Sequence, residues 1–380
     1  MVLGQFVRDP TLSDFPFLSS LASSESPKDR RIWLRVATDH FVATEPSDSD
    51  TVEEYIKAMT AQLDAADSAA RLEVARKLAP CARAPARLLA ALSSADSEAC
   101  DYALEHAVAY ANSELERAVS RSVRSAIAIA KRRCLDPQIV STLAAQDDIL
   151  VLVALASNES ARLEGPTLLD LLRRARRLAE QEGDRRLADA LLQRAPVRRE
   201  SAVLFLCARP NQRIEILLAA QRSQLGRPTA PSVPMRSTSL DELELAAVSR
   251  QPERFVALLA EALDCKRELA QKIVDDATGE PLAVALAALG AANEVLVRIL
   301  ISNDLLAGAS YQRIRALARL NNALDRNAAM MVMAALRDEP AARATRKPSI
   351  EAYPVPAPSR ATPASITKRA GDSPQRMLRK

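Results

Sequence analysis

Residues 88–100, LLAALSSADSEAC, decide the fold of this chain, because the same pattern returns twice. Residues 139–151, IVSTLAAQDDILV, align with them without a gap, and residues 285–297, ALAALGAANEVLV, repeat the arrangement. Each copy contains a leucine followed four positions later by Asp or Asn. These pairs are Leu92 with Asp96, Leu143 with Asp147, and Leu289 with Asn293. The pattern predicts a helix, a turn and a second helix in every copy.

Both members of each pair have a physical role in this prediction. We expect the leucine to pack the end of one helix onto the core. We expect the Asp or Asn to cap the next helix, and such a cap contributes about 1 kcal/mol to stability. A helix pair cannot bury both of its apolar faces alone, so such pairs stack into a HEAT-like solenoid. Helices rich in Ala and Leu also align by chance, so an irregular helical bundle stays open as an alternative.

The rest of the chain also favours helices. Most segments fit a 3.6-residue apolar period, as in residues 68–80, where Leu72, Ala75 and Leu78 share one face and Pro80 ends the helix. Only 8 of 380 residues are Gly and none forms a G-x-G, which argues against phosphate-binding glycine loops and doubly wound sheets. The predicted fold class is therefore all-α.

Several short segments resemble an alphaproteobacterial family, the domain of unknown function 2336. They are RLEVARKLAP at 71–80, the Ala84-Pro85 pair leading to Leu92, AIAIAKR at 126–132, VALASN at 153–158 and ATGEPLAVAL at 277–286. Cys81 departs from the pattern, because an aliphatic residue is expected there. The resemblance implies HEAT-like helical repeats over most of residues 28–338, and it implies no activity and no catalytic residues.

Proline-rich stretches divide the chain. Three prolines within residues 228–234 prevent a continuous helix. We predict a flexible N-terminal arm at 1–27, a HEAT-like repeat domain at 28–222, a Pro-rich linker at 223–239, a smaller helical domain at 240–338, and a disordered, basic, Pro-rich tail at 339–380. The Phe15-Pro-Phe17-Leu18 segment of the arm either caps the open end of the repeats or binds a partner groove.

Charge is concentrated at the C-terminus. The chain has a net charge of +4, yet residues 341–380 hold nine basic residues against Glu351 and Asp372. This tail has six prolines and no apolar period, so it cannot bury enough surface to fold alone. It either contacts nucleic acid or an anionic membrane surface, or it only improves solubility.

A second basic segment lies at residues 162–199, which hold ten arginines. In the helix predicted at 166–179 the leucines form one stripe and arginines lie opposite. The candidate residues for binding an anion or a partner are Arg173, Arg174, Arg176, Arg177, Arg185 and Arg186. The alternative is a solvated face whose charges pair locally with Glu180, Glu182 and Asp184. The 43 Arg against 9 Lys suit phosphate recognition, or they reflect a GC-rich genome.

Catalytic and metal chemistry have few residues to use. The chain has two His and five Cys, without C-x-x-C or H-x-x-x-H spacing. The cysteines are expected to be reduced thiols, mostly in the core, and His106, between Tyr102 and Tyr110, is expected to be a packing residue. No catalytic residue, metal or cofactor is predicted. A cytoplasmic location follows from the lack of a signal peptide and of an 18-residue uncharged run.

These observations favour a non-enzymatic helical-repeat scaffold or regulatory adaptor that binds another protein. The alternative is a nucleic-acid-binding protein that uses the 162–199 segment and the tail. Only Phe205 could stack on a base between residues 121 and 254, which weakens the alternative.

Overall fold

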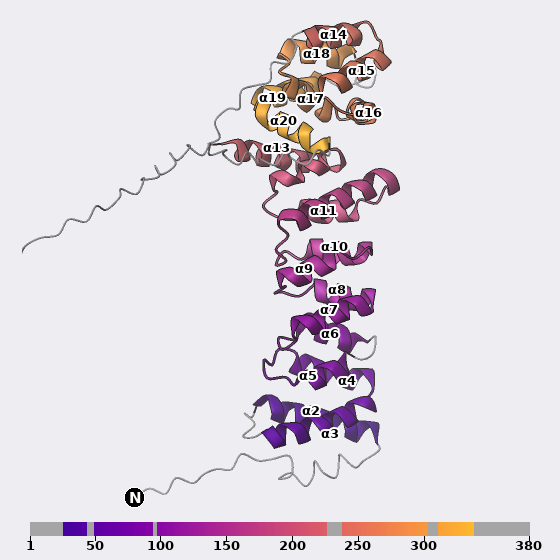
Figure 1. Cartoon of the computed structure of the whole chain (residues 1–380), viewed down its shortest axis with the longest axis vertical. Coiled ribbons are helices and arrows are strands. Elements are labelled where there is room, and N and C mark those ends of the chain that lie inside the picture. Colours follow the sequence, from indigo (N-terminus) through magenta and orange to yellow (C-terminus); the bar gives the residue numbers. More distant parts are fainter. Residues whose placement is uncertain (1–25, 44–48, 94–96, 226–237, 303–310, 338–380) are drawn as a thin grey trace, which may run out of the picture. The chain divides into compact units, whose positions relative to one another are not determined.

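The computed structural model describes residues 26–43, 49–93, 97–225, 238–302 and 311–337 (Figure 1). Every regular element in these ranges is a helix, so the predicted all-α class is confirmed. The predicted arm at 1–27, except its last two residues, and the tail from 339 onward lie outside the described residues. So does most of the predicted linker, although α13 reaches into it at Gln224 and α14 begins in it at Thr238.

The first helices follow one another with short connections (Figure 1). They are α2 (Pro27–Ala43), α3 (Ser49–Asp64), α4 (Ser68–Leu78), α5 (Ala86–Leu92), α6 (Glu98–His106), α7 (Asn112–Arg121), α8 (Val123–Ala130), α9 (Pro137–Ala144) and α10 (Ile149–Ser157). The next are α11 (Gly165–Arg177), the π-helix η2 (Leu178–Glu182), α12 (Arg186–Gln193), the 3₁₀-helix η3 (Arg199–Cys207) and α13 (Pro210–Gln224).

After residue 237 the chain forms a second run of helices. They are α14 (Thr238–Val248), α15 (Pro252–Ala262), α16 (Arg267–Asp275), α17 (Glu280–Leu289), α18 (Asn293–Ser302), α19 (Tyr311–Ala323) and α20 (Arg326–Leu336). Helix α17 contacts α16, α19 and α20, and every residue from Pro281 to Leu289 is buried. A helix that is apolar all round belongs in a core.

Helices that are two elements apart in the chain pack against each other in the first run. Helix α4 contacts α2 and α6, and α8 contacts α6 and α10, which in turn contacts α12. The intervening helices do the same, since α3 packs on α5 and α9 packs on both α7 and α11. Neighbours in sequence are therefore neighbours in space.

The three copies of the sequence pattern are helix-turn-helix units, as predicted. They are α5 with α6, α9 with α10, and α17 with α18. The closing leucines Leu92, Leu143 and Leu289 are all buried.

The predicted capping residue is wrong in the second copy. Asp148, one position later than Asp147, accepts a hydrogen bond from Leu150 N–H at 2.8 Å and caps α10. Asp147 is exposed in the connection between the two helices, because α9 ends at Ala144 and α10 begins at Ile149, which places Asp148 at the capping position. The prediction is also wrong in the first copy, where Ser97, one position after Asp96, accepts from Cys100 N–H at 3.2 Å and caps α6. In the third copy Asn293 is already the first residue of α18, and its side-chain oxygen accepts from Asn321 at 3.0 Å.

Two apolar clusters form the core. The smaller contains buried residues from Trp33 to Ala107, and the larger contains buried residues from Cys100 to Leu336. The larger cluster includes side chains from both runs of helices, because α20 packs against η3 and α13. Contacts between Cα atoms group all of the described residues into one unit.

Many arginines bind the C-terminal carbonyls of earlier helices, a use that neither interpretation of the arginine excess anticipates. Arg132 donates to the carbonyls of Leu104 and Ala107 at the end of α6. Arg326 does the same for Ala288 at the end of α17. The last carbonyls of a helix have no partner within the helix, and they carry its negative dipole end, so a guanidinium stabilises them.

Arg194 makes the largest set of these contacts. It donates to the carbonyls of Ala156 at 2.9 Å, Asn158 and Ala161, which follow one another around the end of α10. Burial lowers the pKa of Arg194 below its ordinary value, which reflects how far its guanidinium is removed from water.

We expect Arg194→Ala to lower the free energy of unfolding by about 2 kcal/mol, because it leaves several buried carbonyls without a donor. Arg198→Ala is the matched control, since Arg198 is about half exposed and makes one 3.6 Å ion pair with Glu164. Urea denaturation followed by circular dichroism measures both changes. Equal effects of the two substitutions would show that the carbonyl contacts of Arg194 add nothing.

Candidate functional site

A groove of about 700 Å³ lies between α11 with η2 on one side and the start of α16 with the end of α20 on the other. Six cationic and three acidic side chains line it. The cations are Arg173, Arg176, Arg177, Lys266, Lys272 and Arg337, and the acids are Glu180, Asp264 and Glu268. Such an excess of positive charge in a concave surface attracts anions.

Helix α11 delivers three of these cations because of its amphipathic pattern. The predicted leucine stripe is confirmed, since Leu168, Leu171 and Leu172 are buried. Arg173, Arg176 and Arg177 lie on the side of α11 that lines the groove. Three of the six residues that the sequence singles out are therefore brought together.

Arg174 does not line the groove. Its guanidinium donates to Gln146 O at 2.8 Å and lies 3.3 Å from Asp170, so it binds the end of α9. Adjacent residues of a helix point about 100° apart, and this rotation directs Arg174 toward α9. The expectation that all four arginines of α11 share one face is therefore corrected.

Arg185 and Arg186 also lie elsewhere. Arg185 donates to the carbonyl of Cys207 at the end of η3. Arg186 pairs with Asp184 at 2.7 Å, as in the local pairing that the sequence leaves open. Both arginines therefore bind groups of the protein itself.

Glu180 lies where the two sides of the groove meet. Its Oε1 accepts from Arg176 Nε at 2.6 Å, and its Oε2 accepts from Lys272 Nζ at 2.6 Å. Burial alone would raise the pKa of Glu180, but these two hydrogen bonds more than offset burial, so its pKa lies below the ordinary value. Glu180 is therefore ionised at neutral pH and neutralises part of the positive charge.

The backbone around Glu180 forms a short π-helix. Five residues, Leu178–Glu182, form η2 at the end of α11, and Gly183 ends it with a left-handed φ of 72°. A single turn of π-helix contains one residue more than a turn of α-helix, so the side chains that follow it point in a different direction. Glu180 lies four positions after Arg176, and the π-helix brings it into contact with Lys272 of α16.

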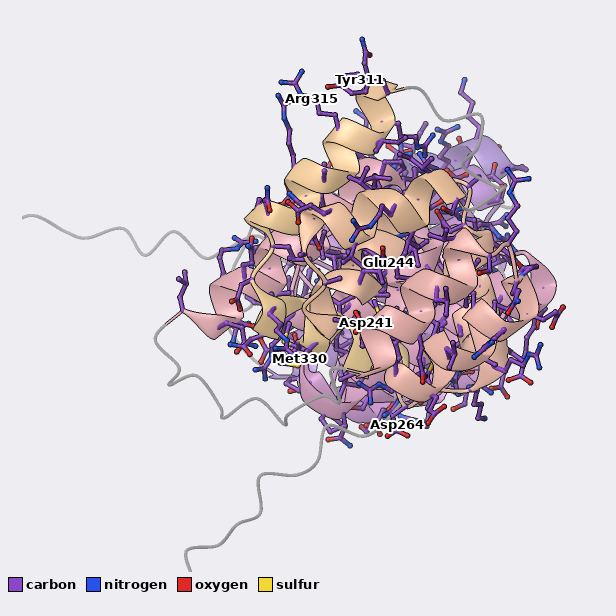
Figure 2. All side chains as sticks on the ribbon, turned by 90° about the horizontal axis from the view of Figure 1, so that it is seen from above. Asp241, Glu244, Asp264, Tyr311, Arg315 and Met330 are labelled. Carbon is purple, nitrogen blue, oxygen red and sulfur yellow. The ribbon has the colours of Figure 1, made fainter. Side chains whose placement is uncertain are left out.

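Arg337 forms the far end of the groove. Only 23% of its side chain is exposed, and its Nε is buried without a hydrogen-bond acceptor among the described residues. The nearest acid is Asp264, whose carboxylate lies 3.9 Å away and is 89% exposed, at the edge of the molecule in Figure 2. A buried donor without an acceptor favours the binding of an external one.

The groove has few groups that could act as a nucleophile. Cys265 lines it, but burial raises the pKa of the Cys265 thiol above its ordinary value, so the thiolate is scarce at neutral pH. No aromatic side chain is among its lining residues. Cationic side chains are therefore the main chemical feature of the groove lining.

Other predicted chemistry is distributed over the fold. His106 is the last residue of α6 and packs on Tyr102 with a ring distance of 4.3 Å. His106 is thus a packing residue, as expected, whereas Tyr110 lies beyond the helix and donates to Leu89 O at 2.9 Å. The five cysteines all lie in the described part of the chain and form no disulfide there; Cys100 and Cys207 are buried, whereas Cys134 is exposed.

Sequence reasoning missed Lys266, Lys272 and Arg337 as members of this site. They lie in the second run of helices, and no local sequence pattern indicates that this run packs near α11. No helix in the described part of the chain is long and apolar enough to cross a bilayer.

Comparison with protein-family models, curated proteins and solved structures finds no match to this chain. The class of protein is therefore defined by its fold and groove alone: an all-helical protein with a basic groove between its two runs of helices.

Proposed function

We propose that this protein is a non-enzymatic scaffold or adaptor of HEAT-like helical repeats, and that its groove binds a negatively charged segment of another protein. The packing of helices two elements apart supports the repeat architecture, together with the three helix-turn-helix units. The resemblance of residues 28–338 to the domain of unknown function 2336 points the same way.

The observation that carries the proposal is the charge and origin of the groove lining. Its six cations come from α11, from the turn before α16, from α16 and from the residue after α20. Long side chains from four places can follow an extended segment, whereas a small-molecule site is mostly apolar. The groove therefore fits an acidic stretch of a protein.

Nucleic-acid binding is the alternative, and the groove favours it less. Single strands are usually held by aromatic side chains, and none lines the groove. A duplex or single-stranded probe in the binding assay distinguishes the two proposals.

The test measures fluorescence anisotropy of a labelled hexaglutamate peptide titrated with the full chain at low salt. Arg177→Glu combined with Lys266→Glu, both exposed lining residues, should weaken binding about tenfold or more through lost attraction and new repulsion. The matched control is Lys131→Glu with Arg133→Glu, which changes the net charge equally at exposed residues outside the groove lining.

Binding that both double variants weaken equally would mean that only net charge matters, and the groove would be rejected. If a labelled oligonucleotide bound more tightly than hexaglutamate, and the groove double variant lost this binding, the nucleic-acid alternative would be favoured.

A further inference from the structure

The closest approach of the two sides of the groove is built around one carboxylate. Arg176 and Lys272 come from α11 and α16, which are far apart in the sequence, and both donate to Glu180 at 2.6 Å. Each carboxylate oxygen receives one of the donors. The two cations therefore form a clamp whose geometry matches a single carboxylate.

The clamp is held in place independently of Glu180. Arg176 also donates through Nη1 to the carbonyl of Leu336 at 2.7 Å, which fixes its guanidinium against the end of α20. Its side chain is only 16% exposed. Lys272 is carried by α16, whose residues Leu269 and Ile273 are buried. The guanidinium of Arg176 and the helix that carries Lys272 would therefore stay in place if Glu180 left.

Glu180 itself is held less firmly by the fold. It lies on η2, which has no buried residue, and Gln181 and Glu182 beside it are exposed. Leu178 at the start of η2 packs against the core, but a movement of residues 180–182 alone exposes no core side chain, so its main cost is the loss of the two ion pairs. A second carboxylate in the clamp would restore both pairs.

We propose that Arg176 and Lys272 form the carboxylate subsite of the groove, and that Glu180 occupies it until an acidic side chain of the partner displaces it. The inference rests on the proposed function, because it names the ligand group of that same groove. Glu180 then acts as an internal competitor that lowers the affinity for weakly acidic segments. Only a segment with several carboxylates, which also meets Arg173, Arg177 and Arg337, gains enough to displace it.

The test compares Glu180→Gln with the wild-type full chain in the hexaglutamate assay. Gln has the shape of Glu without its charge, so it holds the two cations weakly and we expect about tenfold tighter binding of the peptide. The matched control is Glu268→Gln, which removes the same charge from an exposed residue of the same groove. It should tighten binding by less than about threefold.

A double variant tests whether the gain in affinity depends on the clamp. Adding Lys272→Met to Glu180→Gln should remove most of the gain, because one arm of the clamp is then absent. Circular dichroism melting of each variant establishes that it is folded before binding is compared.

Equal gains from Glu180→Gln and Glu268→Gln would overturn the proposal, and so would weaker binding by a folded Glu180→Gln variant. In both cases the groove itself would still bind the peptide, so the proposed function would survive. If neither the wild type nor any variant bound hexaglutamate, the proposed function and this inference would fail together.

Discussion

Arg213→Met is expected to lower the free energy of unfolding by about 3–5 kcal/mol, because it removes one partner of a buried ion cluster. Arg213 is only 4% exposed, on α13. Its guanidinium donates to Asp276 at 2.7 Å, to Glu280 at 3.2 Å and to the carbonyl of Phe205 at 3.1 Å. Replacing it leaves two carboxylates in a largely buried site without their counter-charge.

The position of Arg213 makes this loss important for the whole fold. It lies before residues 226–237, whereas Asp276 and Glu280 lie after them, at the end of α16 and at the start of α17. The arginine therefore attaches the second run of helices to the first. Breaking a buried ion pair by removing one partner costs more than the pair contributes, because the remaining charge stays desolvated.

Urea denaturation of the full chain measures the change, with Arg222→Met as the matched control. Arg222 is on the same helix, is exposed, and makes one 3.3 Å contact with Leu218 O, so we expect a change within about 0.5 kcal/mol. A destabilisation of less than about 1 kcal/mol by Arg213→Met would contradict the assignment of this cluster as a major contribution to stability.

The same cluster predicts a pH dependence. Burial alone would raise the pKa of Asp276, but hydrogen bonds from Arg213 and Thr278 more than offset burial, so its pKa lies below the ordinary value. A lowered folded-state pKa contributes stability above the unfolded value of about 4, and this stability is lost as the pH falls through the folded pKa. The gap in stability between wild type and Arg213→Met should therefore narrow below about pH 4.

Leu286→Ala is expected to cost about 2–5 kcal/mol, the second large effect. Leu286 is fully buried in α17, and α17 contacts helices on several sides. The substitution removes apolar contacts and leaves a cavity that surrounding helices cannot fill by small movements. Because α17 also carries Glu280, loss of its packing should weaken the Arg213 cluster as well.

The measurement for Leu286→Ala is thermal and urea unfolding beside Leu245→Ala. Leu245 is the same residue type on α14 but is 60% exposed, so its truncation should change stability by less than about 0.5 kcal/mol. If the two leucines had equal effects, α17 would not be the centre of the second run of helices.

Helices could be predicted from local pattern because their signals are local. Residues 68–80 carry an apolar stripe and a terminating Pro80, and α4 runs from Ser68 to Leu78. The repeat pattern predicts the cap of α10 one position early, because whether Asp147 or Asp148 takes the cap depends on where the preceding turn ends. Such shifts are the usual limit of boundary prediction from sequence.

The candidate site could be predicted only in part. The arginines of α11 stand out because they cluster in the sequence, and three of them line the groove. The same clustering includes Arg174, although its contacts are with α9. Lys272 and Arg337 carry no signal, because an isolated basic residue on a helix is usually a solvated one.

The amino-acid sequence by itself determined the helical class, the helix-turn-helix units and the concentration of arginine in α11. These properties depend on residues within one or two turns of each other, where periodicity and capping act. Tertiary structure decided which arginines serve the fold and which line a groove. That distinction depends on helices such as α16 and α20, which lie near α11 only in the packed core. An arginine on the surface of a helix caps a neighbouring helix or faces solvent, according to which element lies opposite it.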